Sequence, residues 1–344
     1  MDLKRVILIF IAITFLFSVN LSIPKNAHSQ ATITLKYANF PPAPTFPCVQ
    51  MERWAKEVEK RTNGKVRVQT FPGGTLLPAK GILDGVIAGL ADIGNFAMSY
   101  QPGRFPISEA IDLPVGFSSA RAASLALLDL VEKYNAKEFE KVKILTMYAA
   151  APFHIITMRP VKSLKDLKGM ELRVSGSQAE VLQRLGGIPI AMPQSDTPEA
   201  LQKGVVKGMI TAFEVLKDFN YAAYTSNVTI ANLGTVTFAV VMNKDKWNSL
   251  PADVKKLFND MKREQAEWTG KYEDDHCQEA LAWSKQKYNL QIYELSAPEK
   301  AEISKLLNPI ITEYVKKVNA LGLPGDQILK DVYSLKAKYE KIDK

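Results

Sequence analysis

An alternation of strand and helix patterns, present twice, constrains the fold of this chain more than any other feature. Strand patterns at residues 33–40, 65–71 and 91–96 are separated by helical patterns at 49–62 and 77–89. Short strands joined by helices indicate βαβ units, which build an α/β domain around a largely parallel sheet. The first part of the chain therefore predicts one α/β lobe.

A second α/β unit follows the same order. Its expected strands and helices alternate along the chain: strand 170–174, helix 177–186, strand 188–192, helix 198–207 and strand 208–213. The β-rich stretch 143–158 is expected to cross between the two units, and a strand at 235–243 is expected to return to the first sheet. We therefore assign residues 30–150 to lobe I and residues 151–239 to lobe II.

The last third of the chain is expected to be helical. Helical periodicity from Pro251 onward runs unusually long for one globular helix, and further helices are predicted at 297–321 and 325–340. We expect residues 251–344 to form a long helix and a C-terminal helical segment, with residues 240–270 and the C-terminal helices returning to lobe I. Two lobes joined by crossing strands are typical of a binding protein.

Residues 1–29 have the pattern of a secretory signal peptide. Lys4 and Arg5 precede an uncharged apolar run at 6–19, and Ala-His-Ser at 27–29 is a small-x-small cleavage motif. The run is short for a bilayer span, although an uncleaved membrane anchor stays open as an alternative. We expect cleavage after the motif and a periplasmic mature protein.

Charge and composition argue against a nucleic-acid-binding protein. Removing the signal peptide removes three positive charges and one negative charge, so the net charge falls from +8 to +6. The lysines are spread along the chain without an arginine-rich arm, and we expect no nucleic-acid partner. A hydrophobic content of 47% and a charged content of 23% are ordinary for a globular protein.

No catalytic or metal-binding pattern is visible. The histidines are His28, His154 and His276, and no G-x-S-x-G motif or nucleophile–histidine–acid set accompanies them. We expect no catalytic residues, no metal and no cofactor, and hence no enzyme. Whether Cys48 and Cys277 form a disulfide stays open.

Arg173 is the strongest candidate for a binding residue. It lies between Leu172 and Val174 in a predicted buried strand, and a buried arginine cannot lose its proton, so it needs an anion. The alternative is that Arg173 is exposed, with the aliphatic part of its side chain lying on apolar surface and its guanidinium in water. Because ligands bind beyond the carboxyl ends of strands in open α/β sheets, we expect Arg173 to face the cleft and to bind a carboxylate.

Several stretches of the chain resemble the solute-binding proteins of TRAP (tripartite ATP-independent periplasmic) transporters. The stretches that carry the resemblance are RPVKSLKDLKGMELRV, LGGIPIAMP and PEALQKGVVKG, with VEKRTNGKVRVQTFPGGTL, ILDGVIAGLADIG, GRFPISEAIDLPVGF and MNKDKWNSLPADVKK outside that core. Together they cover nearly the whole mature chain.

The resemblance implies a two-lobed periplasmic-binding-protein fold of type II-like form, with mixed sheets, crossing hinge strands and a long C-terminal helix. It also implies that the protein captures a small organic carboxylate through Arg173, in the motif G-x-x-x-R-V, and delivers it to the membrane permease subunits of a TRAP transporter. A monomer is favoured over a dimer. The alternatives are a binding protein for an ABC importer, a chemoreceptor, and an exported hydrolase.

By the same resemblance, seven further residues are expected to line the pocket: Phe40, Asn95, Phe96, Phe153, Gln194, Thr211 and Phe213. The alternative for the four phenylalanines is that they are ordinary core residues. The alternative for Gln194 and Thr211 is that they lie in turns that face the solvent. Four aromatic rings and one arginine fit a compact or aromatic monocarboxylate. A keto acid, a cyclic amide acid, an aromatic acid, a dicarboxylate and a sulfonate all stay open.

Overall fold

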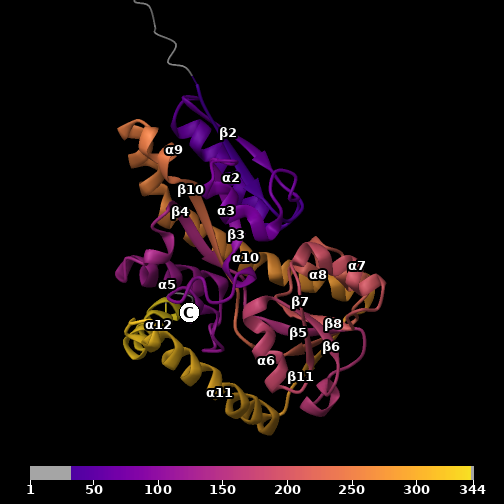
Figure 1. Cartoon of the computed structure of the whole chain (residues 1–344). Helices are drawn as coiled ribbons and strands as arrows, with labels where there is room; N and C mark the ends of the chain where they lie inside the picture. The colour runs from indigo at the N-terminus through magenta and orange to yellow at the C-terminus, as the bar shows by residue number, and fades with distance from the viewer. Residues whose placement is uncertain (1–31, 342–344) are drawn as a thin grey trace, which may run out of the picture. The chain divides into compact units, whose positions relative to one another are not determined.

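Two β-sheets organise the part of the chain that the computed structural model describes, residues 32–341 (Figure 1). Their strand orders are β2-β1-β3-β10-β4 and β11-β9-β5-β8-β6-β7. We call the parts built around them lobe I and lobe II. The predicted signal peptide, residues 1–29, lies outside the described residues.

Lobe I contains a mixed five-stranded sheet. β1 pairs in parallel with β2 and β3, whereas β10 runs antiparallel to β3 and β4. The strands are β1 (Ile33–Asn39), β2 (Val66–Phe71), β3 (Ile93–Ala97), β4 (Val142–Ala149) and β10 (Thr237–Asn243). The helices are α2 (Phe46–Arg61), α3 (Ile82–Ile87), α4 (Glu109–Asp112), α5 (Ala120–Lys133) and α9 (Lys244–Ser249), with short 3₁₀ turns η1 (Ala79–Gly81), η2 (Met98–Tyr100) and η3 (Lys137–Phe139).

Lobe II contains a mixed six-stranded sheet. β6 pairs in parallel with β7 and β8, and β5 runs antiparallel to β8 and β9. The strands are β5 (His154–Thr157), β6 (Glu171–Val174), β7 (Ile188–Ala191), β8 (Gly208–Thr211), β9 (Asn227–Ile230) and β11 (Gln291–Glu294). The helices are α6 (Ala179–Arg184), α7 (Thr197–Gln202) and α8 (Val215–Asp218), with turns η4 (Leu164–Leu167), η5 (Gly176–Gln178), η6 (Gln194–Asp196) and η7 (Tyr221–Ala223).

Long-range elements connect the two lobes. The chain passes from β4 to β5 and returns from β9 to β10, as the sequence predicted. Helix α10 (Ala252–Tyr288) packs against α2 and α5 of lobe I and against α8 of lobe II. Helix α11 (Ala297–Ala320) packs on α6, and α12 (Gly325–Glu340) packs on α5 (Figure 1). A two-lobed α/β fold with mixed sheets, crossing strands and a long helix is therefore confirmed.

One expectation for the last third of the chain is wrong. Residues 251–344 are not entirely helical, because β11 pairs in parallel with β9 at the edge of the lobe II sheet. Helix α10 ends at Tyr288. The next residue, Asn289, caps it with a left-handed φ of 53°, and the chain then turns into the strand. The four residues of β11 have no strong strand pattern of their own, so pairing with a distant strand decides their conformation.

The lobes approach each other closely beside η5. A Cβ atom on Gly176 would lie 2.4 Å from the backbone oxygen of Ser99, which belongs to η2 of lobe I. Only glycine fits at such a distance from the opposite backbone. Among residues 32–341, no helix is both long and apolar enough to span a bilayer.

Candidate functional site

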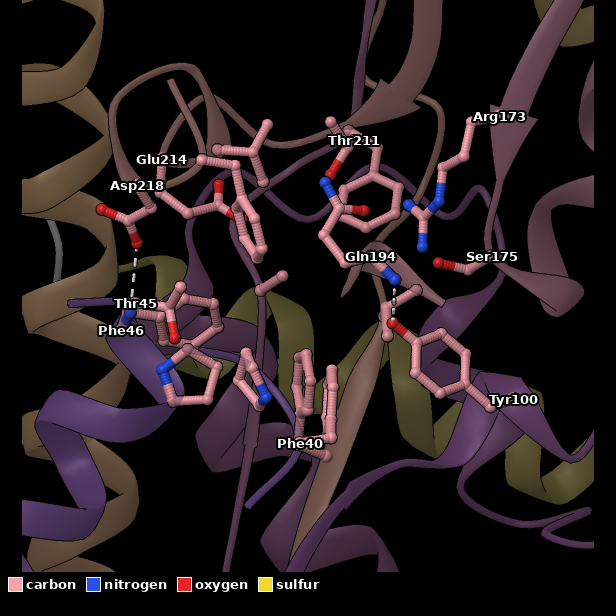
Figure 2. Close-up of a pocket in the computed structure, with 18 residues that line it drawn as sticks. Phe40, Thr45, Phe46, Tyr100, Arg173, Ser175, Gln194, Thr211, Glu214 and Asp218 are labelled. Carbon is pink, nitrogen blue, oxygen red and sulfur yellow. Dashed lines mark hydrogen bonds between the residues drawn. The ribbon is translucent and has the colours of Figure 1, made fainter. Parts of the chain in front are cut away.

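A cavity of about 50 Å³ lies where lobe I and lobe II face each other (Figure 2). Several of its lining residues follow the carboxyl ends of strands, as expected for ligand sites in open α/β sheets. Phe40 follows β1, Ser175 follows β6 and Thr211 ends β8. The full lining is Phe40, Pro41, Thr45, Phe46, Pro47, Tyr100, Ala150, Phe153, Arg173, Ser175, Gln194, Thr211, Glu214, Val215, Asp218, Phe219, Val236 and Phe238.

Arg173 is buried at this cavity without an acidic partner. Its side chain is 1% exposed, and its Nε and Nη2 atoms donate to the backbone oxygen of Met192 at 3.1 and 2.9 Å. No carboxylate of residues 32–341 lies within ion-pair distance of it. Burial of an unpaired charge is unfavourable by several kcal/mol. The guanidinium, which points into the pocket in Figure 2, is therefore suited to an anion.

Gln194 provides a second donor beside Arg173. Its backbone amide donates to the Tyr100 hydroxyl at 2.9 Å, and its backbone oxygen accepts from the Tyr221 hydroxyl at 2.9 Å. These two bonds fix the residue, while its side-chain Nε2 is buried and has no partner among the described residues. An oxyanion near Arg173 would satisfy this amide nitrogen. Tyr100 belongs to lobe I, so the first bond also joins the lobes.

Aromatic rings form the apolar wall of the cavity. Phe46 packs edge-on against Tyr148 and Phe238, with ring centroids 5.8 and 5.7 Å apart, and Phe40 packs edge-on against Tyr100 at 5.4 Å. Such edge-to-face contacts hold the rings in fixed orientations. The wall therefore offers a rigid apolar surface to the part of a ligand that carries no charge.

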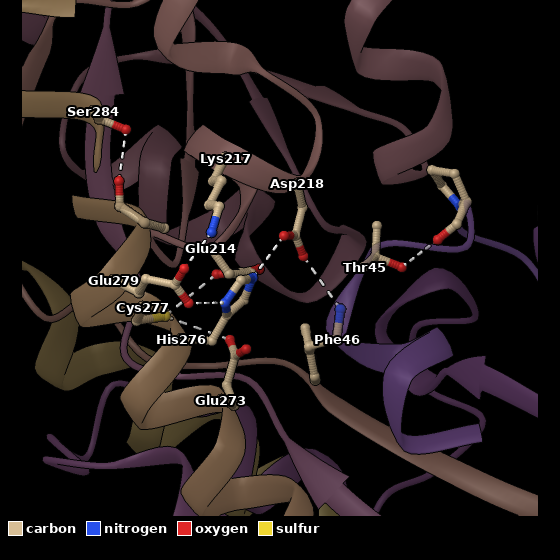
Figure 3. Close-up of polar contacts among 12 residues, drawn as sticks. Thr45, Phe46, Glu214, Lys217, Asp218, Glu273, His276, Cys277, Glu279 and Ser284 are labelled. Carbon is tan, nitrogen blue, oxygen red and sulfur yellow. Dashed lines mark hydrogen bonds and ion pairs between the residues drawn. The ribbon is translucent and has the colours of Figure 1, made fainter. Parts of the chain in front are cut away.

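Two acids lie across the pocket from Arg173 (Figure 2). The Asp218 carboxylate contacts His276 Nε2 at 2.6 Å and accepts from the backbone amide of Phe46 at 3.2 Å. The Glu214 carboxylate accepts from the Cys277 thiol at 3.6 Å (Figure 3). This side of the pocket is acidic, whereas the Arg173 side is basic.

Burial perturbs the ionisation of this acidic side. Desolvation and the nearby Asp218 raise the pKa of Glu214 to about 7. Desolvation also raises the pKa of Glu273, which contacts Cys277 on α10, well above its ordinary value. The hydrogen bond to Asp218 raises the pKa of His276. Each shift follows from removing the charged group from water or from pairing it.

The cavity includes five of the eight residues predicted for the site. These are Arg173, Gln194, Thr211, Phe40 and Phe153. Their contact with a ligand stays a prediction.

Asn95, Phe96 and Phe213, which were also expected at the pocket, are not among the residues that line this cavity. The Asn95 side chain bonds to Asn39 at 2.9 Å and to the Tyr148 hydroxyl at 2.8 Å inside the lobe I sheet. Phe96 packs on Phe105 with ring centroids 5.5 Å apart. Phe213 stacks on His154 with ring centroids 4.4 Å apart. Strand β8 ends at Thr211, so the alternation of side chains between the two faces of the sheet does not extend to Phe213.

Other residues of the cavity were not predicted. Thr45 and Phe46 belong to the proline-rich stretch 40–47, which follows the first strand, and that position was a usable signal. Asp218 and Phe238 gave no local signal, because they reach the cavity from distant parts of the chain. Tyr100 lines the cavity and also joins the lobes through its bond to Gln194.

His154 is a core histidine rather than a donor to the cleft. Its Nδ1 atom accepts from the backbone amides of Ala231 and Asn232, and burial lowers its pKa to about 4. Cys48 and Cys277 are both buried and free, so they do not form a disulfide.

Comparison with known proteins identifies the class. Residues 41–317 match bacterial extracellular solute-binding protein, family 7, known as DctP. The C4-dicarboxylate-binding periplasmic protein DctP of Rhodobacter capsulatus is 25% identical over 309 residues, which cover 88% of this chain and 92% of that protein. The chain therefore belongs to family 7 of the bacterial extracellular solute-binding proteins.

Solved structures agree with this assignment. A TRAP periplasmic solute-binding protein from Desulfovibrio salexigens is 54% identical, with a TM-score of 0.82, over 90% of this chain and 97% of that one. That structure is an open complex with the C-terminus of a symmetry mate bound in the ligand-binding site. A marine-metagenome TRAP solute-binding protein specific for aromatic acids, crystallised with 3-hydroxybenzoate, is 30% identical, with a TM-score of 0.85. The match covers 90% of this chain and 99% of that one. The chain is a TRAP solute-binding protein.

Proposed function

We propose that this protein captures a small monocarboxylate, preferably an aromatic one, between its two lobes. The observation that carries the proposal is the guanidinium of Arg173, which is buried at the cavity with no acidic partner among the described residues. A ligand carboxylate would supply the missing charge through a planar, two-pronged contact. The unpartnered Nε2 of Gln194 would donate to the same carboxylate.

The opposite side of the pocket favours one carboxylate over two. A second carboxylate on the ligand would approach Glu214 and Asp218, and like charges repel strongly when they are desolvated. The rings of Phe40, Phe46 and Phe238 favour a flat apolar group in that position.

Two relatives support this ligand class. The marine-metagenome relative takes aromatic acids. The C-terminus in the binding site of the Desulfovibrio relative offers a carboxylate, which every unmodified chain terminus carries.

The same proposal covers delivery and location. Ligand would enter between separated lobes, and closure would bury it and form the surface that the TRAP membrane components bind; hinge closure of periplasmic binding proteins is a well-known example of such a change. We propose that the mature protein acts in the periplasm, as a monomer, and releases its ligand chemically unaltered. The family assignment favours TRAP components over the ABC-importer, chemoreceptor and hydrolase alternatives.

A thermal-shift screen of the purified protein tests this function. Benzoate and 3-hydroxybenzoate should raise the Tm, succinate should raise it less, and benzamide, which matches benzoate in shape without its charge, should leave it unchanged. Stabilisation of about 2.7 kcal/mol is expected when the ligand is present at 100 times its Kd. An equal effect of benzamide and benzoate, or no effect of any monocarboxylate, would contradict the proposal.

A further inference from the structure

A second unsatisfied polar site lies at the junction of the lobes, away from the ligand cavity. Ten buried side-chain polar atoms lack a hydrogen-bond partner among the described residues, and five of them are oxygens of four residues that lie together. They are both carboxylate oxygens of Asp112, Ser177 Oγ, Gln178 Oε1 and Thr237 Oγ1. Buried polar atoms in native proteins rarely stay unpaired, so such a concentration requires an explanation.

Hydrogen bonds and close approaches bring these four residues together. The Gln178 side-chain nitrogen donates to the backbone oxygens of Asp112 and Thr235 at 3.2 and 3.1 Å, which fixes the amide and leaves Oε1 as the free end. The hydroxyls of Ser177 and Thr237 and the backbone amide of Thr237 face the Asp112 carboxyl closely enough to lower its pKa, although the side-chain contacts do not reach hydrogen-bond geometry. The resulting cluster contains side-chain oxygen atoms of the kind that bind cations, and they come from three separate elements, α4, η5 and β10.

Asp112 lacks a compensating positive charge. It is 4% exposed, and no Lys, Arg or His of residues 32–341 lies within ion-pair distance of it. Burial raises the pKa of Asp112 to about 7, and Glu109 on the same helix adds repulsion. A buried carboxylate is stable only when it is protonated or paired with a cation.

An acidic groove leads to this carboxylate. Asp112 and Ser177 belong to the lining of a surface cavity of about 660 Å³ between α4, α6 and α11. Its charged lining residues are Glu109, Asp112, Glu180, Glu313 and Lys317, four acids against one base. Three of these acids are ion-paired, Glu109 with Lys317 and both Glu180 and Glu313 with Arg184. Asp112 is therefore the acid of this lining that has no cationic partner among the described residues.

We propose that a small monovalent cation binds among the oxygens of Asp112, Ser177, Gln178 and Thr237. Carboxylate, hydroxyl and amide oxygens are hard ligands, and no nitrogen or sulfur atom of the cluster competes with them. A single formal negative charge is balanced by a charge of +1, whereas a divalent ion would leave a buried net charge. Asp112 and Thr237 belong to lobe I, and Ser177 and Gln178 belong to lobe II, so the cation would tie the lobes together.

The first test compares cations at constant ionic strength. The Tm of the purified protein should rise with NaCl relative to choline chloride, with saturation and by about 2 °C or more. Asp112→Asn, which keeps the side-chain shape, should abolish the rise, and Glu180→Gln, which removes an exposed acid from the same groove, should keep it. Equal Tm values in sodium and choline, or a sodium effect retained in Asp112→Asn, would overturn the proposal.

A second measurement does not depend on how the variant folds. Crystals of the unaltered protein soaked in Tl⁺, a monovalent ion with strong anomalous scattering, should show an anomalous peak among the four side chains. Sodium nitrate in excess, in chloride-free solution so that Tl⁺ does not precipitate as its chloride, should reduce that peak. Density for water alone at this position, without an anomalous signal, would overturn the proposal even if sodium raised the Tm through another site.

Discussion

The Asp218 carboxylate of lobe II caps the first turn of a helix in lobe I, by accepting from the backbone amide of Phe46 at 3.2 Å (Figure 3). Helix α2 has no cap of its own, because Thr45 at its N-cap makes no side-chain capping bond and its first turn contains no acid. His276 on α10 holds the other carboxylate oxygen at 2.6 Å. The amides of Cys48 and Val49 bond to Thr45 within lobe I, so in the first turn of α2 it is the Phe46 amide that takes its protein partner from the other lobe.

Asp218→Ala should weaken ligand binding by destabilising the closed arrangement. Loss of a helix cap is unfavourable by about 0.5–2 kcal/mol, which corresponds to roughly 2- to 30-fold. The dissociation rate of benzoate, measured by stopped-flow fluorescence, should rise while the association rate changes little. Asp218→Asn should retain most of the affinity, because asparagine caps as well as aspartate.

A matched control for this prediction is Glu199→Ala, which removes an exposed acid from α7 of lobe II. It should leave both rates unchanged. If Asp218→Ala also leaves them unchanged, closure does not depend on the cap.

Glu273→Gln should flatten the dependence of stability on pH. The folded-state pKa of Glu273 is raised, so above the ordinary pKa of a glutamate the native protein binds more protons than the unfolded chain, and the free energy of unfolding falls as the pH rises. One such proton contributes up to about 1.4 kcal/mol per pH unit. The variant should be more stable than the parent at pH 8 and similar to it at pH 5.

Urea unfolding at both pH values measures this difference. Glu302→Gln, a change at an exposed acid on α11, serves as the control and should follow the parent protein. A parallel loss of stability with rising pH in Glu273→Gln and the parent would show that the slope comes from other groups.

Phe153→Ala and Phe213→Ala should separate affinity from stability. Phe153 lines the cavity, and loss of about 50 Å² of apolar contact at ~25 cal/mol/Å² should weaken benzoate binding roughly tenfold. Phe213 packs on His154 outside it, so its removal should lower the Tm and leave the affinity nearly unchanged. Calorimetric titration with melting curves checks both, and equal losses of affinity would contradict the assigned positions.

The sequence predicted the fold well because its signals were local. The alternation in residues 33–96 and 170–213 specified both lobes, and the strand now seen as β10 returned to lobe I as expected. The short strands β9 and β11 were missed, since strands of four residues take their conformation from distant partners in the sheet.

The site was predicted less completely. Arg173 was predicted from its place in a recognisable buried strand and Gln194 from the family resemblance, whereas Asp218 and Phe238 face the cavity only after distant segments have folded together. Phe96 and Phe213 were expected at the cavity but do not line it. A phenylalanine near a strand end can face the core or the cleft, and one residue of offset decides between them.

The most direct test of the account is calorimetric titration of the parent protein, Arg173→Lys and Arg173→Ala with benzoate, alongside a melting curve of each ligand-free variant. Arg173→Ala should bind at least about 100-fold more weakly, because two charge-assisted hydrogen bonds of roughly 1.5–3 kcal/mol each are lost. Arg173→Lys should also bind poorly, since a point charge cannot form the planar contact. Full affinity in Arg173→Ala, or a loss of binding that only follows unfolding, would show that Arg173 is a structural residue and would contradict the carboxylate assignment.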